Sequence, residues 1–366
     1  MLKRRTFLVS GLLSSLAAAA TPACGATAAG LAGRLSRYRR DGKAAPGIVA
    51  GVLDTSQRRI VTAGTAGTAG AGRALNGDTV FAIASLTKVF TALLLAEMAS
   101  RGEVALDDPV NRYLPAKVRI PAQKGRELRL AHLAGYVSGL PGWPPNLTGL
   151  DPTKPFPAYP QADLYAALND GPLKIPPGGR YEYSNFAFGL LAHVLARRGG
   201  KSFEEMLVTR ICEPLGMKST RITPDAAMRA RLAPAHADAA KTVQPWLFPE
   251  TLQGAGALYS TANDMLNFLE GATGRRNALS RAFASLLKVR HPTDKTDVEA
   301  ASGWMISSTG GEDHAWKDGA TVGYSSFAGF SLRSRDALVL LANGQCGSSF
   351  GVFGRHVLNV RFPAPA

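Results

Sequence analysis

The segments of this chain that resemble β-strands lie near its two ends, and the helical patterns lie between them. Two runs rich in β-branched residues, at 47–53 and 59–63, are separated by four polar residues and predict an antiparallel pair. Four more strand-like runs lie near the C-terminus, at 303–308, 314–318, 325–332 and 337–342. This distribution predicts an α+β fold. The N- and C-terminal strands would form one antiparallel sheet flanked by helices, with an inserted, mostly helical domain.

Helices are predicted where apolar residues recur at helical spacing. They fall at 31–40, 89–98, 161–168, 185–198, 203–211, 261–269 and 281–289. Thr261 is placed as an N-cap, with Asp264 at the reciprocal capping-box position. Residues 115–180 are rich in Pro and Gly and predict a cleft wall. We expect a sheet domain from 29–82 and 290–366, a helical domain from 83–289, and an active site at their junction.

The N-terminus has the three-part layout of an export signal. Three basic residues, at 3–5, precede an uncharged run that is shorter than a bilayer span, and small residues follow to position 28. Because paired arginines stand before Thr-Phe-Leu, we expect a twin-arginine signal over 1–28 and a periplasmic location. The residues before Cys24 do not fit a lipid-anchor motif. No later segment predicts a stable membrane span.

The charge and the cysteine and histidine patterns exclude several classes of site. The formal net charge is +15, but the basic residues are scattered and no nucleic-acid motif accompanies them, so we expect no nucleic-acid partner. Cys212 and Cys346 could pair in an oxidising compartment, but two small buried thiols are the favoured interpretation. The histidines form no metal-binding spacing. We predict no metal, no cofactor and a monomer.

Ser85 and Lys88 are the candidate nucleophile and its neighbour. They share one helix face about one turn apart, and a serine needs such a neighbour to lose its proton. Chance also produces this spacing, since Ser285 and Lys288 repeat it on a segment that predicts an ordinary amphipathic helix. Two further motifs follow in order, and each occurs once in the chain: Tyr183-Ser184-Asn185 and Lys317-Asp318-Gly319.

With these motifs the chain resembles the serine β-lactamase and penicillin-binding-protein superfamily, and specifically its class C branch. The resemblance covers roughly residues 45–345. It rests on the segments 81–88, 131–141, 183–191, 213–217, 254–261 and 340–344. That branch also contains D-alanyl-D-alanine carboxypeptidases and some esterases.

The resemblance implies a role for each candidate residue. Ser85 would form an acyl-enzyme, Lys88 and Tyr183 would relay its proton, and Asn185 would hold Lys88. Lys317 would join Lys88 in lowering the pKa of Tyr183, and the backbone N–H groups of Ser85 and Ala320 would form the oxyanion hole. The residues implied in substrate binding are Trp143, Asp318, Gly319 and Asn343.

Two positions depart from the family pattern and leave the substrate open. Asp318 stands where the family often has a threonine that helps to bind a substrate carboxylate, and an aspartate would repel that group. Trp143 gives the cleft an aromatic wall suited to bulky acyl groups. The first hypothesis is hydrolysis of β-lactams or D-Ala-D-Ala peptides of peptidoglycan. The second is a carboxylesterase, and the third is a non-catalytic, penicillin-recognising envelope protein.

Overall fold

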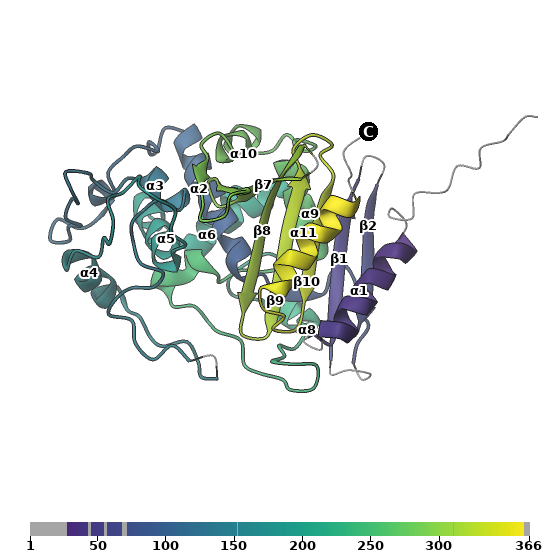
Figure 1. The fold of residues 1–366 in the computed structure, drawn as a ribbon. Coiled ribbons are helices and arrows are strands. Elements are labelled where there is room, and N and C mark those ends of the chain that lie inside the picture. The colour runs from purple at the N-terminus through teal and green to yellow at the C-terminus, as the bar shows by residue number, and fades with distance from the viewer. Residues whose placement is uncertain are drawn as a thin grey trace, which may run out of the picture.

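The computed structural model describes residues 28–42, 45–54, 57–67, 72–151, 153–309 and 311–361. The predicted export signal, its cleavage positions and Cys24 therefore lie outside the described residues, except for Ala28. Figure 1 shows a central sheet with helices packed on both of its faces and a helical region to one side. The predicted α+β architecture is confirmed, while the predicted domain boundaries stay a prediction.

The sheet has eight strands, and all of its neighbouring strands are antiparallel. Their order across the sheet is β2-β1-β10-β9-β8-β7-β6-β5, so strands from the two ends of the chain meet where β1 pairs with β10. The strands are β1 (Gly47–Leu53), β2 (Arg58–Gly64), β5 (His291–Pro292), β6 (Val298–Ala300), β7 (Met305–Thr309), β8 (Glu312–Thr321), β9 (Tyr324–Ser331) and β10 (Ala337–Ala342). The predicted bounds of β1 and β10 match those observed.

The helices fill the middle of the chain and both ends. They are α1 (Ala28–Gly42), α2 (Thr87–Ser100), α3 (Leu130–Ala134), α4 (Gln161–Asn169), α5 (Asn185–Gly199), α6 (Phe203–Leu207), α7 (Glu213–Leu215), α8 (Ala226–Arg231), α9 (Ala262–Ala272), α10 (Ser280–Leu286) and α11 (Ser349–Arg361). Short turns of other helix types are η1 (Ala84–Leu86), η2 (Val110–Tyr113), the π-helical η3 (Val208–Cys212) and η4 (Glu250–Ala255). A separate two-strand ladder pairs β3 (Val80–Ala82) with β4 (Tyr259–Thr261).

Alternate residues of the central strands pack into two different cores, because successive strand side chains point to opposite faces. On one face, Ile48 and Leu340 pack with residues of α1 and α11. On the other face, Val49 and Leu341 join the larger core that includes α2 and α9. Both faces of β1 and β10 are therefore covered, which explains why these strands read as continuous apolar runs.

Helix α2 is the central helix of the larger core. Every residue from Thr87 to Met98 is buried, as expected for a helix that is apolar on all sides. Glu97 is 1% exposed, and it forms ion pairs with Arg101 and Arg210. Because α2 is enclosed by other elements, the residues at its N-terminal end are held firmly, and Ser85 lies directly before it.

Several elements of the structure differ from the predictions. The C-terminal helix α11 was not predicted. The helix predicted over 281–289 ends at Leu286. Thr261 does cap α9, but the Asp264 carboxylate turns away and accepts hydrogen bonds from the Ser219 N–H and the Thr220 hydroxyl, so it joins α9 to another segment. Cys212 and Cys346 are both free and buried, as the favoured interpretation predicted.

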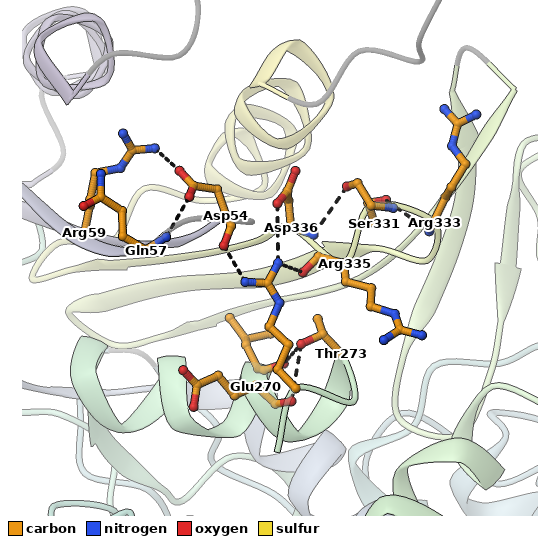
Figure 2. A network of polar contacts seen from close by, with 12 residues as sticks. Asp54, Gln57, Arg59, Glu270, Thr273, Ser331, Arg333, Arg335 and Asp336 are labelled. Carbon is orange, nitrogen blue, oxygen red and sulfur yellow. Dashed lines mark hydrogen bonds and ion pairs between the residues drawn. The ribbon is translucent and has the colours of Figure 1, made fainter. Parts of the chain in front are cut away.

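Arg275, in the turn after α9, contacts the β1–β2 turn and the β9–β10 turn at one end of the sheet. The Arg275 guanidinium donates to the backbone oxygens of Asp54 and Arg335 and lies 3.6 Å from the carboxylate of Asp336. Figure 2 shows Asp54 and Asp336, from the β1–β2 and β9–β10 turns, converging beside the end of α9. Among the residues that the structure describes, no helix is both long and apolar enough to cross a membrane.

Candidate active site

Most of the predicted site residues converge on one cavity of about 400 Å³. Its lining comes from η1, from the start of α5, from β8, from α11 and from the loops that carry Trp143 and Trp246. The predicted residues that line it are Ser85, Trp143, Tyr183, Asn185, Lys317, Asp318, Gly319 and Ala320. Residues from four distant parts of the sequence therefore form one site.

Ser85 is presented by a tight turn between β3 and α2. The preceding residue, Ala84, has φ of 47°, a left-handed conformation that is unfavourable for a residue with a side chain. Two hydrogen bonds to the backbone of Ile83 hold this turn in place. The Ser326 hydroxyl donates to the Ile83 carbonyl (2.7 Å), and the Ile83 N–H donates to the Leu258 carbonyl (2.9 Å). The strained turn is thus fixed by the sheet, and the Ser85 hydroxyl stays in the cavity.

Lys88 lies beside Ser85 and is completely buried. Its ammonium donates to Ser85 Oγ (3.1 Å), to Asn185 Oδ1 (2.8 Å) and to the Ala255 carbonyl (2.6 Å). Burial lowers the pKa of Lys88. These contacts match the predicted arrangement in which Asn185 holds Lys88, and they add the backbone of Ala255, which the sequence did not suggest.

Tyr183 donates a hydrogen bond from its hydroxyl to Ser85 Oγ at 2.7 Å. The Nζ atoms of Lys88 and Lys317 lie 4.8 and 5.3 Å from the centroid of its ring. Burial opposes ionisation of the phenol, but the two cations outweigh it, so the pKa of Tyr183 is lowered. A phenol with a lowered pKa is more readily deprotonated, and the phenolate, hydrogen-bonded to a serine hydroxyl, can accept the serine proton during nucleophilic attack.

The strand β8 brings Lys317, Asp318 and Gly319 into the cavity beside Ser85. The Lys317 ammonium donates to the carbonyl (2.8 Å) and to Oδ1 (3.1 Å) of Asp318. Burial disfavours the charge of Lys317, but the negative charges of Tyr183 and Asp318 outweigh it and raise the pKa of Lys317. Burial likewise opposes ionisation of Asp318, and Lys317 outweighs it, so the pKa of Asp318 is lowered. The two residues form an ion pair at the cavity wall.

Gly319 allows the backbone of β8 to approach the nucleophile turn closely. A β-carbon at position 319 would lie 2.6 Å from Ser326 Oγ and 2.8 Å from both Ile83 O and Ser85 N. Only a glycine fits this contact, because two of the three atoms belong to backbone. Ala320, the next residue, lines the same cavity. The backbone N–H groups of Ser85 and Ala320 thus lie on neighbouring segments, as an oxyanion hole requires.

An aromatic cluster forms another wall of the cavity, and Trp143 is the member that was predicted from the sequence. Trp143, Trp246 and Phe248 line the cavity, and Phe156 packs behind them at ring-centroid distances of 5.6 Å from Trp143 and 5.1 Å from Trp246. The sequence feature that could have indicated Trp246 and Phe248 is the apolar run at 246–248 inside a polar, Pro-containing loop. Leu247 in this run is 73% exposed, which is unusual for a large apolar residue.

Asn343 does not line the cavity, so its assignment to substrate binding is corrected. It is fully buried. Its Oδ1 accepts from the Gly47 N–H (2.8 Å), and its Nδ2 donates to the Ala66 carbonyl (2.9 Å). It follows β10 directly and satisfies backbone groups of the first and last segments of the β1–β2 hairpin, at its open end, which is a structural task.

The second Ser-x-x-Lys pair behaves as the sequence analysis expected. The Ser285 hydroxyl donates to the Ala282 carbonyl within α10, and Lys288 is exposed beyond the end of that helix. Neither residue lines the cavity. Within the described part of the chain, no group of three His, Cys, Asp or Glu side chains is placed to hold a metal ion.

Comparisons with known proteins agree with this geometry. The family model described as Beta-lactamase matches residues 34–357. The chain is 36% identical over 193 residues to the D-alanyl-D-alanine-carboxypeptidase/endopeptidase AmpH of Escherichia coli, which covers 53% of this chain and 49% of AmpH. It is 31% identical over 157 residues to Esterase EstB of Burkholderia gladioli, 40% of each protein. The chain thus spans about half or less of the length of these relatives.

The fold also matches a solved structure over most of its length. The crystal structure of a beta-lactamase/D-alanine carboxypeptidase from Yersinia pestis, complexed with citrate, superposes with a TM-score of 0.76. The match covers 91% of this chain and 97% of the other, at 24% identity. Since the identity is low, this likeness supports the fold.

Proposed function

This chain belongs to the Beta-lactamase family, and from that membership we propose that it is a serine hydrolase that forms an acyl-enzyme at Ser85. One observation carries the proposal: the Ser85 hydroxyl receives hydrogen bonds from both Tyr183 (2.7 Å) and Lys88 (3.1 Å) inside a cavity. A serine in ordinary surroundings has no such neighbours and is a weak nucleophile.

In the proposed mechanism, Tyr183 takes the proton of Ser85 as Oγ attacks the substrate carbonyl. Tyr183 must be a phenolate before the attack, and Lys88 and Lys317 stabilise this phenolate, since both cations lie close to its ring. The negative charge on the substrate oxygen is bound by the N–H groups of Ser85 and Ala320, a contribution of roughly 3 kcal/mol per donor. Tyr183 then returns the proton to the leaving group, and water hydrolyses the acyl-enzyme.

The substrates that we propose first are β-lactams and D-Ala-D-Ala-type peptides of peptidoglycan. Lys317 in the cavity and the activity named for the relative AmpH support this choice. A β-lactam and a D-Ala-D-Ala peptide each present an amide carbonyl for attack, so one serine can serve both. The difference between a β-lactamase and a carboxypeptidase then depends on how fast water removes each acyl group.

A carboxylesterase is the second candidate, and two observations favour it. The wall of Trp143, Trp246 and Phe248 offers an apolar surface to a bulky acyl group. The carboxylate of Asp318 lines the cavity, where it disfavours a substrate carboxylate. The relative EstB carries the name of an esterase.

Labelling of Ser85 tests the common mechanism. An uncharged fluorescent fluorophosphonate should label the wild-type protein and a Ser285→Ala variant equally, because Ser285 lies outside the cavity. The Ser85→Ala variant should lose the label. Equal labelling of the Ser85→Ala variant would refute the proposed nucleophile.

Turnover assays then separate the substrate classes. Release of D-alanine from a muropeptide would identify a carboxypeptidase, and turnover of a chromogenic cephalosporin would identify a β-lactamase. Turnover of p-nitrophenyl butyrate alone would establish the esterase. Labelling by a fluorescent penicillin without turnover of any substrate would favour the third hypothesis, a penicillin-recognising protein that does not catalyse hydrolysis.

We also propose that the enzyme acts in the periplasm. The twin-arginine pattern of residues 1–28 supports this location. The net positive charge of the chain also suits a compartment that contains anionic envelope polymers. Cell fractionation tests this: the protein should appear in the periplasm, and replacing Arg4 and Arg5 with lysine should retain it in the cytoplasm. Periplasmic export that survives this change would rule out the twin-arginine route.

A further inference from the structure

We propose that Asp318 selects substrates that present a hydrogen-bond donor, rather than a carboxylate, beside Lys317. The donor is an amide N–H or an ammonium group on the leaving-group side of the scissile bond. The inference rests on the proposed acylation of Ser85. It narrows the proposed substrates, because it favours peptides that are amidated or that continue beyond the scissile bond over β-lactams and D-Ala-D-Ala peptides with a free carboxylate.

Asp318 lines two cavities. It lines the main cavity and also a second cavity of about 170 Å³, whose other members include Tyr181 and Lys295. The two cavities share Tyr183, Lys317 and Asp318. A group bound in either cavity therefore lies near Asp318.

Of the two charged groups in this ion pair, the Asp318 carboxylate is the one that a ligand can contact. The Lys317 side chain is 4% exposed, whereas the Asp318 side chain is 39% exposed. The Lys317 ammonium already donates to two atoms of Asp318, its carbonyl oxygen and Oδ1. The Lys317 ammonium thus already has acceptors within the protein. The more exposed group of the pair is the Asp318 carboxylate, which accepts hydrogen bonds.

The surrounding charges keep this carboxylate ionised. Lys317 and, more weakly, Arg355 of α11 both lower the pKa of Asp318 against the opposing effect of burial. Lys88 is buried and has its own acceptors, and Lys295 in the second cavity is accompanied by Asp294. An ionised carboxylate only accepts hydrogen bonds, so it requires a donor from the ligand.

Gly351 keeps the space beside the carboxylate open. It lines the main cavity together with Gly347 and Ser348 at the start of α11. A β-carbon at position 351 would lie 2.4 Å from Asp318 Oδ2. Any larger residue would displace the carboxylate or cover it, so the glycine preserves access to Asp318 from the cavity.

The consequence for a ligand follows from charge and hydrogen bonding. A substrate carboxylate next to Asp318 would face a like charge in a partly desolvated site, where repulsion is stronger than in water. An amide N–H or an ammonium would instead form a hydrogen bond to a charged acceptor, one of the stronger kinds. Peptides that continue beyond the scissile bond, or that end in an amide or amine, fit this requirement.

Three ligands that differ in one group test the inference. They are N-acetyl-D-alanyl-D-alanine, its C-terminal carboxamide, and the analogue in which an aminomethyl group replaces the carboxylate. Each competes with the uncharged fluorophosphonate for Ser85, and its half-inhibitory concentration is measured. We expect the carboxamide or the aminomethyl ligand to compete at least about tenfold better than the free acid. The stronger of the two shows whether the preferred donor is neutral or cationic.

Substitution of the aspartate completes the test. The Asp318→Asn variant keeps the shape of the side chain, and the preference for the donor ligands should fall by about tenfold or more. Asp163→Asn, an exposed residue of α4 outside the cavity, should keep the wild-type preference. Thermal unfolding of both variants confirms that they are folded.

The outcomes are separable from those of the proposed function. Absence of fluorophosphonate labelling at Ser85 would refute the acyl-enzyme itself. With Ser85 labelled, equal or better competition by the free acid would overturn the role of Asp318. So would no competition by any ligand, or an unchanged preference in Asp318→Asn.

Discussion

The hydroxyl of Ser85 has two neighbours that could take its proton, Tyr183 at 2.7 Å and Lys88 at 3.1 Å. Lys88 also donates to Asn185 and to the backbone of Ala255, so its three N–H groups each have an acceptor. Burial lowers the pKa of Lys88, but three acceptors satisfy its ammonium form. Tyr183, flanked by two cations, is therefore the better proton acceptor, and Lys88 assists by its charge.

Removal of one cation should shift the pH dependence of acylation. Tyr183 must lose its proton to act as a base, so acylation rises with pH through its pKa, and Lys317 lowers that pKa. In Lys317→Met the pKa of Tyr183 should rise, and the rising limb of the profile should move to higher pH by about one unit. The rate of Ser85 labelling by the uncharged fluorophosphonate, followed from neutral to alkaline pH, measures this shift.

A charge-conserving variant provides the control for that experiment. Lys317→Arg retains a cation near the phenol, so its pH profile should stay close to that of the wild type, whatever the change in maximal rate. A profile of Lys317→Met with an unmoved limb would show that Lys317 does not tune Tyr183.

The catalytic side chains were predictable from the sequence, and the apolar lining was not. Tyr183 and Lys317 stood out because each motif occurs once and in a fixed order after Ser85. Trp246 and Gly351 carry no such motif, and their place at the cavity depends on how distant loops pack. Asn343 shows the opposite error, since it lies in a matching segment, but its side chain serves the β1–β2 hairpin.

At the scale of elements, helix α11 approaches the sheet closely at Gly351 and Gly354. A β-carbon at Gly354 would lie 2.3 Å from the Phe327 ring, and Phe327 is fully buried. The sequence of α11 did not predict a helix, because two glycines and several β-branched and aromatic residues lower helix propensity. These glycines are points of close packing, which no local sequence rule distinguishes from helix breakers.

Alanine at position 354 should therefore destabilise the protein even though alanine favours helices. The buried ring of Phe327 cannot move aside freely, and overpacking of this kind costs about 1–3 kcal/mol in free energy of unfolding. Urea denaturation of Gly354→Ala measures the loss.

Gly33 offers a matched control on another helix. It lies in α1 with no atom within 4 Å of the added β-carbon, so Gly33→Ala should stabilise by about 0.5–1 kcal/mol through helix propensity alone. If both variants change stability in the same direction, the packing account of Gly354 is wrong.

The contacts of Arg275 predict a second stability effect between elements. Arg275→Ala removes two hydrogen bonds to backbone and an ion pair with the buried Asp336, and this should lower the free energy of unfolding by about 1–3 kcal/mol. Its neighbour Arg276 pairs with Glu270 of the preceding helix and is about one-third exposed, so Arg276→Ala should cost less than about 1 kcal/mol. Urea denaturation compares the two, and equal losses would contradict the linking role of Arg275.

At the scale of the whole molecule, strands from the two ends of the chain pair within one sheet. The strands β1 and β10 pair directly although the entire helical region separates them in sequence. Periodicity predicted both strands with their observed bounds because they are buried on both faces and bordered by polar turns. The short β5 and β6 were not predicted, since strands of two and three residues carry too little pattern.

A shared core should make the molecule unfold as one unit. The larger hydrophobic core is continuous from Val49 of β1 through Phe90 of α2 to Leu191 of α5. The chain has four tryptophans, and two of them, Trp304 and Trp316, are buried in the sheet region.

In a Trp143→Phe/Trp246→Phe variant, fluorescence therefore reports the sheet, while far-UV ellipticity is dominated by the helical insert. We expect the two signals to change at the same urea concentration, because neither region retains its core without the other. Separate transitions would show that the helical insert folds independently of the sheet that closes around it.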